Sequence, residues 1–113
     1  MPDNAARDLF PGALEMMVLR LLKQEPLHGY ALVQRIQQAS RNLLQVEEGS
    51  LYPALQRLLK DGLVSAEWGV SSTNRRVRIY SLTRAGAKHL ANEISSFERM
   101  FQGINLILAL EDR

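Results

Sequence analysis

Apolar residues recur every three to four positions in the first part of the chain, which is the spacing of one face of a helix. The first run follows Pro11 and ends near Glu25-Pro26, because the residue before a proline disfavours the α-helical conformation. The second run opens at His28 and ends near Ser40–Asn42. The apolar positions of these two predicted helices are Leu14, Met17, Val18, Leu21 and Leu22, followed by Leu32, Val33 and Ile36.

A third amphipathic helix is predicted within the segment VEEGSLYPALQRLLKDGLV. Pro53 is tolerated only in the first turn of a helix, so this helix should begin near Gly49–Ser50. Gly62 is the natural residue to end it. The apolar stripe consists of Leu51, Leu55, Leu58 and Leu59. The opposite side carries Gly49, Tyr52, Pro53, Gln56, Arg57 and Lys60.

The pattern then changes to one that is typical of strands. The segments LVSAEW and VRIYSL are rich in β-branched and aromatic residues, and the second alternates Val77 and Ile79 with Arg78 and Tyr80. Between them lies GVSSTNRR, a loop rich in small polar residues. Strand, polar loop and strand predict a β-hairpin with arginines at its far end.

The last segment predicts one long helix that begins after Ser81 or Thr83 and runs to about Leu110. Its apolar positions are spaced alternately by three and four residues, as in a coiled-coil seam. The seam consists of Ala87, Leu90, Ile94, Phe97, Phe101, Ile104 and Leu108, widened by Met100 and Ile107. A helix of this length spans about 40 Å and outreaches a small domain, so we expect the seam to pack against a second subunit.

The order helix, helix, helix, hairpin, long helix predicts a mainly α protein with a small β-hairpin wing (α+β). This order is that of a winged helix-turn-helix, in which the third helix enters the major groove of DNA. The expected organisation is an N-terminal tail (1–10), a winged-helix DNA-binding domain (11–82) and a C-terminal dimerisation helix (83–113).

Charge and composition narrow the partner class. The net charge is only +2, yet no acid lies between Trp68 and Asn92, where Arg75, Arg76 and three further basic residues gather. One basic stretch in a nearly neutral chain favours an anionic partner met at one place, although a solvated basic loop is the plain alternative. The chain has no cysteine and only two histidines, so we expect no metal and no cofactor.

Other classes find little support in the sequence. No Gly-rich phosphate loop and no pairing of nucleophile and base is present, so we do not expect an enzyme. Glu47 and Glu48 precede a predicted helix, where the helix dipole favours acids, and this explains them better than acid–base catalysis. Neither a signal peptide nor an apolar run long enough to cross a membrane is visible, so we expect a cytoplasmic protein.

Three segments resemble the signatures of the PadR family of bacterial transcriptional regulators. These are PLHGYALVQRI, EEGSLYPALQRLLKDGLVSAEW and NRRVRIYSLTRAG, and the resemblance covers about Leu14 to His89. The single long last helix is similar to that of the short subfamily. The resemblance implies a homodimeric winged-helix protein that binds operator DNA, and most members of the family are repressors.

The resemblance also suggests which residues contact DNA. It places the start of the third helix at DNA and the arginines that follow the loop on the wing. Tyr52 alternatively is a half-buried aromatic at the helix flank, and Arg57 alternatively belongs to a solvated face. The candidate DNA-binding residues are Ser50, Tyr52, Pro53, Arg57, Arg75, Arg76 and Arg78.

The last helix supplies the candidate dimer interface and a candidate effector site. The interface residues are Leu90, Ile94, Phe97, Phe101, Ile104 and Leu108. Some family members respond to phenolic acids or planar drug-like molecules, and those that bind drugs carry a tryptophan in the last helix. Here the only tryptophan, Trp68, lies in the first wing strand. A small aromatic effector would instead meet Phe97, Met100, Phe101 and Ile104, and a solid dimer core without an effector is the alternative.

Three further residues have local interpretations. His28 is expected to cap the second helix rather than bind an effector, and Tyr30 and Trp68 are expected to be packing residues. The leading hypothesis is a homodimeric, sequence-specific regulator of transcription. The alternative is a winged-helix adaptor that binds proteins and not DNA, which would be expected to lack the wing arginines.

Overall fold

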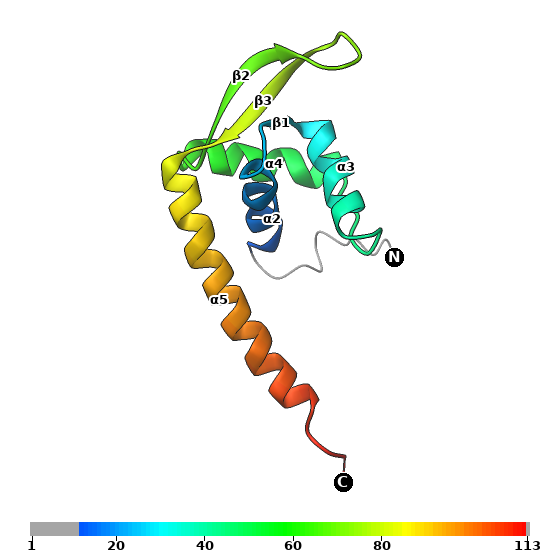
Figure 1. Cartoon of the computed structure of the whole chain (residues 1–113), viewed down its shortest axis with the longest axis vertical. Helices are drawn as coiled ribbons and strands as arrows, with labels where there is room; N and C mark the ends of the chain where they lie inside the picture. The colour runs from blue at the N-terminus through cyan, green and yellow to red at the C-terminus, as the bar shows by residue number, and fades with distance from the viewer. Residues whose placement is uncertain (1–11, 113) are drawn as a thin grey trace.

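The structure, a computed structural model, describes residues 12–112, so the predicted tail (1–10) lies outside it. The helical body carries a hairpin that rises from one side and a long helix that projects in the opposite direction (Figure 1). This arrangement is a winged helix-turn-helix with a long C-terminal helix, as predicted. The elements are α2 (Ala13–Leu22), β1 (Leu27–His28), α3 (Gly29–Ala39), α4 (Glu48–Lys60), β2 (Val64–Val70), β3 (Arg76–Leu82) and α5 (Arg84–Leu108).

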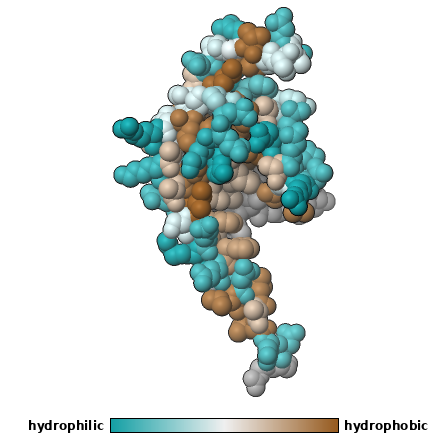
Figure 2. All heavy atoms as spheres, in the orientation of Figure 1, coloured by the Kyte–Doolittle hydropathy of each residue, from teal (hydrophilic) through white to brown (hydrophobic). Residues whose placement is uncertain are grey.

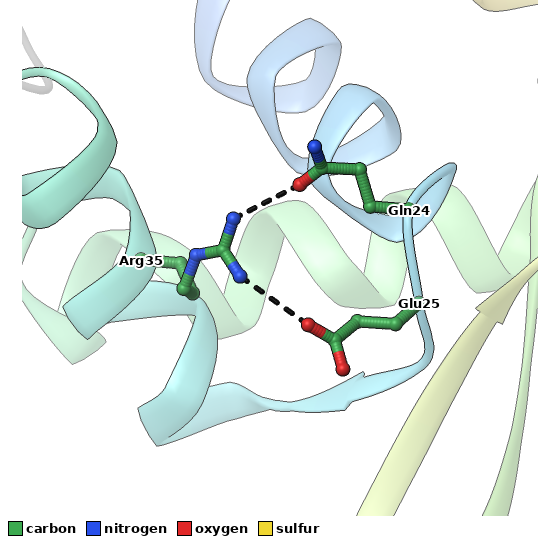
Figure 3. A network of polar contacts seen from close by, with 3 residues as sticks. All are labelled: Gln24, Glu25 and Arg35. Carbon is green, nitrogen blue, oxygen red and sulfur yellow. Dashed lines mark hydrogen bonds and ion pairs between the residues drawn. The ribbon is translucent and has the colours of Figure 1, made fainter.

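The core forms where the apolar faces of α2, α3 and α4 meet. Its centre includes Leu19, Leu32, Leu51 and Leu55, which are fully buried. The loop between α2 and α3 is held from outside by Arg35, whose guanidinium binds Gln24 Oε1 at 2.9 Å and Glu25 Oε2 at 3.3 Å (Figure 3). These contacts hold α3 against the end of α2.

The glycine predicted to end the third helix does so. Gly62 follows α4 with φ of 73°, a left-handed conformation that glycine adopts without a steric penalty. Its N–H binds the Leu59 carbonyl, and the Leu63 N–H binds the Leu58 carbonyl, each at 3.0 Å. This is the Schellman pattern, which turns the chain directly from α4 into β2.

The start of α4 differs from the prediction. The helix begins at Glu48, so Pro53 lies in the second turn and not in the first. A proline there leaves the carbonyl of Gly49 without its helical partner. Gly49 is exposed to solvent, so water can satisfy that carbonyl and the helix continues.

The wing is a three-stranded antiparallel sheet with the order β1-β3-β2. The predicted hairpin is confirmed, and its strands pair from Val64↔Leu82 to Val70↔Arg76. The short strand β1 was not predicted, because two residues are too few to carry an alternating pattern. It pairs Leu27 with Tyr80 and so ties the wing to the start of α3.

Helix α5 begins as predicted at Thr83. The Thr83 hydroxyl accepts a hydrogen bond from the Gly86 N–H at 3.0 Å and donates one to the Gly62 carbonyl at 2.8 Å. Gly86 is buried, and a Cβ on it would collide with the Leu63 carbonyl. The first turn of α5 is therefore fastened to the turn between α4 and β2.

Thr83→Ala is expected to lower the free energy of unfolding by about 1 kcal/mol, the usual cost of losing a helix N-cap. Urea denaturation of the two proteins measures the change. Thr83→Ser keeps the hydroxyl and should retain most of the stability. Equal losses in both variants would contradict a role for the hydroxyl.

Only the first half of α5 packs on the body of its own chain. Leu90 is 2% exposed and lies in the core, with Ile94 partly buried beside it. Leu90 needs no second subunit to bury it, so we leave it out of the proposed interface. Ala87, which the spacing placed in the seam, is exposed. The three–four spacing continues along α5, but the same face of the helix lies against the core at Leu90 and is exposed to solvent farther along.

Candidate nucleic-acid interface

One face of the wing turns toward the helices. Side chains alternate between the two faces of a sheet, so Trp68, Arg76 and Arg78 share the face of Tyr80, which is 3% exposed and packs in the core. Farther out along the hairpin the same face is open to solvent, and Trp68 is 57% exposed. The Cζ atom of Arg76 lies 4.4 Å from the centroid of the Trp68 ring, and that of Arg78 lies 5.5 Å from it. Both distances fall within the range of cation–π interactions.

The tip of the hairpin is a short, well-formed turn that presents Arg75. The Ser71 carbonyl accepts a hydrogen bond from the Asn74 N–H at 2.9 Å, and Asn74 has a left-handed φ of 62°. The Ser71 N–H closes the loop on the Arg75 carbonyl at 2.8 Å. A three-residue loop that ends in a left-handed residue suits the twist of a hairpin. The backbone of Arg75 is therefore fixed, and its side chain is exposed.

The starts of α3 and α4 form the wall opposite the wing. His28 caps α3 as predicted, with Nδ1 accepting a hydrogen bond from the Ala31 N–H at 3.4 Å. The ring of Tyr52 lies directly over Gly29, where a Cβ would come within 2.6 Å of the Tyr52 hydroxyl oxygen. The absence of a side chain at position 29 lets this ring pack between the two helices.

Tyr52 has the half-buried position at the helix flank that was one of its two expected roles. Its ring is packed at the helix flank, and 41% of the residue is still exposed. Burial, followed by the negative charge of Glu48, raises the pKa of Tyr52 above its usual value of 10.0. A hydrogen bond between the Tyr52 hydroxyl and the Glu48 carboxylate contributes to the same rise, so the phenol is protonated and its hydroxyl interacts with Glu48.

The two walls enclose a groove with a volume of about 970 Å³. Its lining brings together four of the seven candidate DNA-binding residues, from segments that lie far apart in the sequence. These four are Tyr52, Arg75, Arg76 and Arg78. In the part of the chain that the structure describes, the three arginines have no carboxylate within ion-pair distance, so their charges face the solvent.

The other three candidates lie outside the groove. Arg57 is on the flank of α4 that faces α2, and its Nε binds Glu15 Oε2 at 2.9 Å. The ion pair directs the Arg57 side chain toward α2, and Arg57 does not line the groove, so we leave it out of the proposed interface. Ser50 and Pro53 lie near the start of α4, where Pro53 is exposed and Ser50 is partly buried. Helical spacing puts Ser50 and Tyr52 on opposite flanks.

The groove also contains residues that sequence reasoning interpreted differently. Tyr30 and Trp68, expected to be packing residues, are 54% and 57% exposed, and both line the groove. Glu48 adds the one carboxylate of the lining. Trp68 and Arg78 are opposite each other because of the register of the hairpin. The sequence would have predicted this contact only if the position of the turn, which sets the register, had been known.

The second half of α5 presents an apolar surface to solvent. Figure 2 shows hydrophobic residues gathered on the part of α5 that projects below the body. Phe97 and Phe101 are stacked, with ring centroids 6.0 Å apart and planes inclined by 9°. The exposed apolar residues are Met100 (41%), Phe101 (50%), Leu106 (67%), Ile107 (67%) and Leu108 (75%). We call the surface of Met100, Phe101, Ile104, Ile107 and Leu108 the α5 seam.

The four candidate effector residues do not share one cavity in a single subunit. Phe97 and Met100 line a hollow of about 170 Å³ between α5 and the start of α2. Phe101 lines a separate hollow of about 370 Å³, which also includes Asn105 and Leu106.

Within residues 12–112, none of the helices is long and apolar enough to cross a membrane.

Comparisons with known proteins agree with this fold. Residues 18–92 match the model of the transcriptional regulator PadR-like family. The members of this family are regulators and not enzymes. A transcriptional regulator of Mycobacterium tuberculosis is 32% identical over 83% of this chain and 84% of its own length.

Among solved structures, a transcriptional regulator from Clostridium thermocellum superposes with a TM-score of 0.78 at 28% identity, covering 87% of this chain and 92% of that one. A PadR-like regulator from Bacillus cereus gives a TM-score of 0.74 at 28% identity, covering 89% and 96%. Bacillus subtilis PadR, solved in complex with operator DNA, shares the fold with a TM-score of 0.64 at 22% identity, covering 72% of this chain and 47% of that one. The chain, with its winged helix-turn-helix and basic wing groove, belongs to the PadR-like family of transcriptional regulators.

Proposed function

We propose that this protein is a homodimeric, sequence-specific repressor that binds operator DNA through the wing groove and the start of α4. The observation that carries the proposal is the groove itself, which Arg75, Arg76 and Arg78 line together with Tyr52, and within residues 12–112 none of the three arginines forms an ion pair with a carboxylate. Arginine binds phosphate through two parallel N–H groups, so a cluster of unpaired arginines suits the DNA backbone.

In this proposal the start of α4 contacts the DNA bases and so provides the sequence specificity. Pro53 and its exposed neighbours Gly49 and Gln56 face outward from the body, and Tyr52 and Ser50 flank them. A helix that enters the major groove contacts base edges from such a face. The arginines of the wing position the protein and carry little base-specific information.

The exposed apolar surface of the α5 seam favours association with a second subunit. Its apolar side chains are exposed in the single chain, and burying them gains free energy in proportion to the area removed from water. A repeated three–four spacing lets two such helices interlock. Two subunits would place two α4 helices at the spacing of operator half-sites. A repressor of this kind acts in the cytoplasm, where bacterial DNA lies.

A small aromatic effector fits the same interface. The hollow beside Phe101, at about 370 Å³, lies in the range of small-ligand sites, and a second subunit would cover its open side. A ligand that favours another crossing of the helices would change the separation of the two α4 helices. Displacement of operator DNA by phenolic acids and planar aromatic compounds tests this step. If none of these compounds binds, the dimer core is solid and the protein represses constitutively.

Recovery of bound fragments from genomic DNA of the source organism tests the main proposal. The expected result is a palindromic site that binds more tightly than random DNA, with an affinity that falls steeply with salt. An adaptor that binds proteins only would recover no common site and show no salt-dependent affinity for DNA.

A further inference from the structure

Trp68 is a large aromatic residue that the core does not explain. It is 57% exposed on the groove face of the wing, although its strand neighbours Val64 and Ala66 on the same face pack inward. The guanidinium groups of Arg76 and Arg78 both lie within cation–π distance of its ring. Trp68 is thus outside the core, and two arginines lie beside its ring.

The strand register explains how one ring reaches two arginines. Trp68 is directly opposite Arg78, and Arg76 lies two residues along β3 on the same face, at the diagonal position. Long and aromatic side chains interact across both positions of an antiparallel pair. The 4.4 Å and 5.5 Å distances place both cations near the ring.

Stacking organises an arginine without using its hydrogen-bonding capacity. A cation–π contact uses the positive charge of the guanidinium and not its N–H groups as hydrogen-bond donors, so these groups stay available for an anion. A free arginine loses rotamer freedom when it binds, and a stacked one has already lost much of it. The stack therefore lowers the entropic cost of forming the contact.

The surrounding charges favour an anion beside this stack. Two like charges held over one ring repel each other, and a phosphate between them relieves that repulsion. Glu67, the acid next to Trp68 in the chain, lies on the other face of β2 opposite Ile79. Glu48 lines the groove from α4 and interacts with Tyr52.

We propose that Trp68 is a positioning residue, which stacks with Arg76 and Arg78 and holds both guanidiniums ready for a DNA phosphodiester in the wing groove. This inference rests on the proposed DNA-binding function. Trp68 itself acts through the arginines and needs no contact with a base.

The first test is a double-mutant cycle on DNA affinity. Trp68→Ala should weaken binding to operator and random DNA by about five- to tenfold, from two exposed cation–π contacts. The slope of log K against log salt should stay unchanged, because the protein keeps all its charges. Trp68→Ala should have a much smaller effect in an Arg76→Ala, Arg78→Ala background.

Two matched variants separate positioning from stability. Trp68→Phe keeps a weaker stacking face and should lose less affinity than Trp68→Ala. Val70→Ala removes an exposed apolar side chain from the same face and should bind DNA as the wild type does. Losses from Trp68→Ala and from the arginine variants that simply add up would overturn the positioning role, since they would indicate that Trp68 contacts DNA independently.

The second test needs no DNA. Trp68 is the only tryptophan in the sequence, so its fluorescence reports the stack directly. Arg76→Ala with Arg78→Ala should change the emission of the free protein, while Arg75→Ala should not. Unchanged emission would overturn the stack itself. Wild-type protein without salt-dependent DNA binding would refute the proposed function, and the fluorescence would still decide whether the stack forms.

Discussion

Replacing Phe101 with aspartate is expected to convert a dimer into monomers. Phe101 lies on the α5 seam, and a charge buried there without a partner costs about 3–5 kcal/mol. The dissociation constant of the dimer should therefore rise by about two to three orders of magnitude. Sedimentation velocity at micromolar concentration measures the change.

The matched control for this substitution is Leu43→Asp. Leu43 is 85% exposed in the connection between α3 and α4 and is not part of α5, so the same charge there should leave the dimer intact. Wild-type protein that sediments as a monomer at micromolar concentration would contradict the proposed interface. So would a dimer that survives Phe101→Asp.

Separating the two subunits should also weaken binding to operator DNA. Two linked subunits bind two half-sites with an effective concentration that a single subunit lacks. Phe101→Asp should thus weaken operator binding while the α4 helix and the wing of each subunit remain folded. Circular dichroism checks the folding, because Phe101 lies outside the core of its own chain.

Replacing Arg75 and Arg76 with alanine is expected to weaken binding to operator and to random DNA alike, by about 100-fold or more. Hydrogen bonds to charged groups contribute about 1.5–3 kcal/mol each, and a dimer loses them twice. The slope of log K against log salt should fall by about one unit for each phosphate contact that is lost. A salt titration with both DNAs measures affinity and slope together.

The control removes the same charge elsewhere. Arg20→Ala with Arg99→Ala takes away two exposed arginines that do not line the groove, and the salt slope should stay close to that of the wild type. A slope that falls equally in both double variants would show that net charge, and not the wing, governs binding. Loss on the operator alone would contradict a phosphate-contacting role.

Much of the fold follows from local pattern. The helical spacing of leucines, the turn residue Gly62 and the cap residue Thr83 predicted α4 and α5 to within a few residues, because these signals act over one or two turns. The alternation in VRIYSL predicted β3 for the same reason. The motif residues also identified the family, which the match over residues 18–92 confirms.

Pro53 and β1 mark where local rules stopped being sufficient. A proline is excluded from the second turn of an isolated helix, but the packing of Leu51, Leu55 and Leu58 in the core keeps α4 continuous through it. Strand β1 exists because β3 offers it an edge to pair with, and two residues carry no signal of their own.

The sequence by itself determined which residues are available to the site: a basic wing, a tyrosine at the start of a helix and an apolar seam. Only the tertiary structure decided how they are combined. It places Tyr52 with the wing arginines in one groove, binds Arg57 to Glu15, and buries Leu90 in the core. The physical reason is that the direction of a side chain follows from local geometry, whereas its partner depends on which elements pack together, and that packing is set by contacts between residues far apart in the chain.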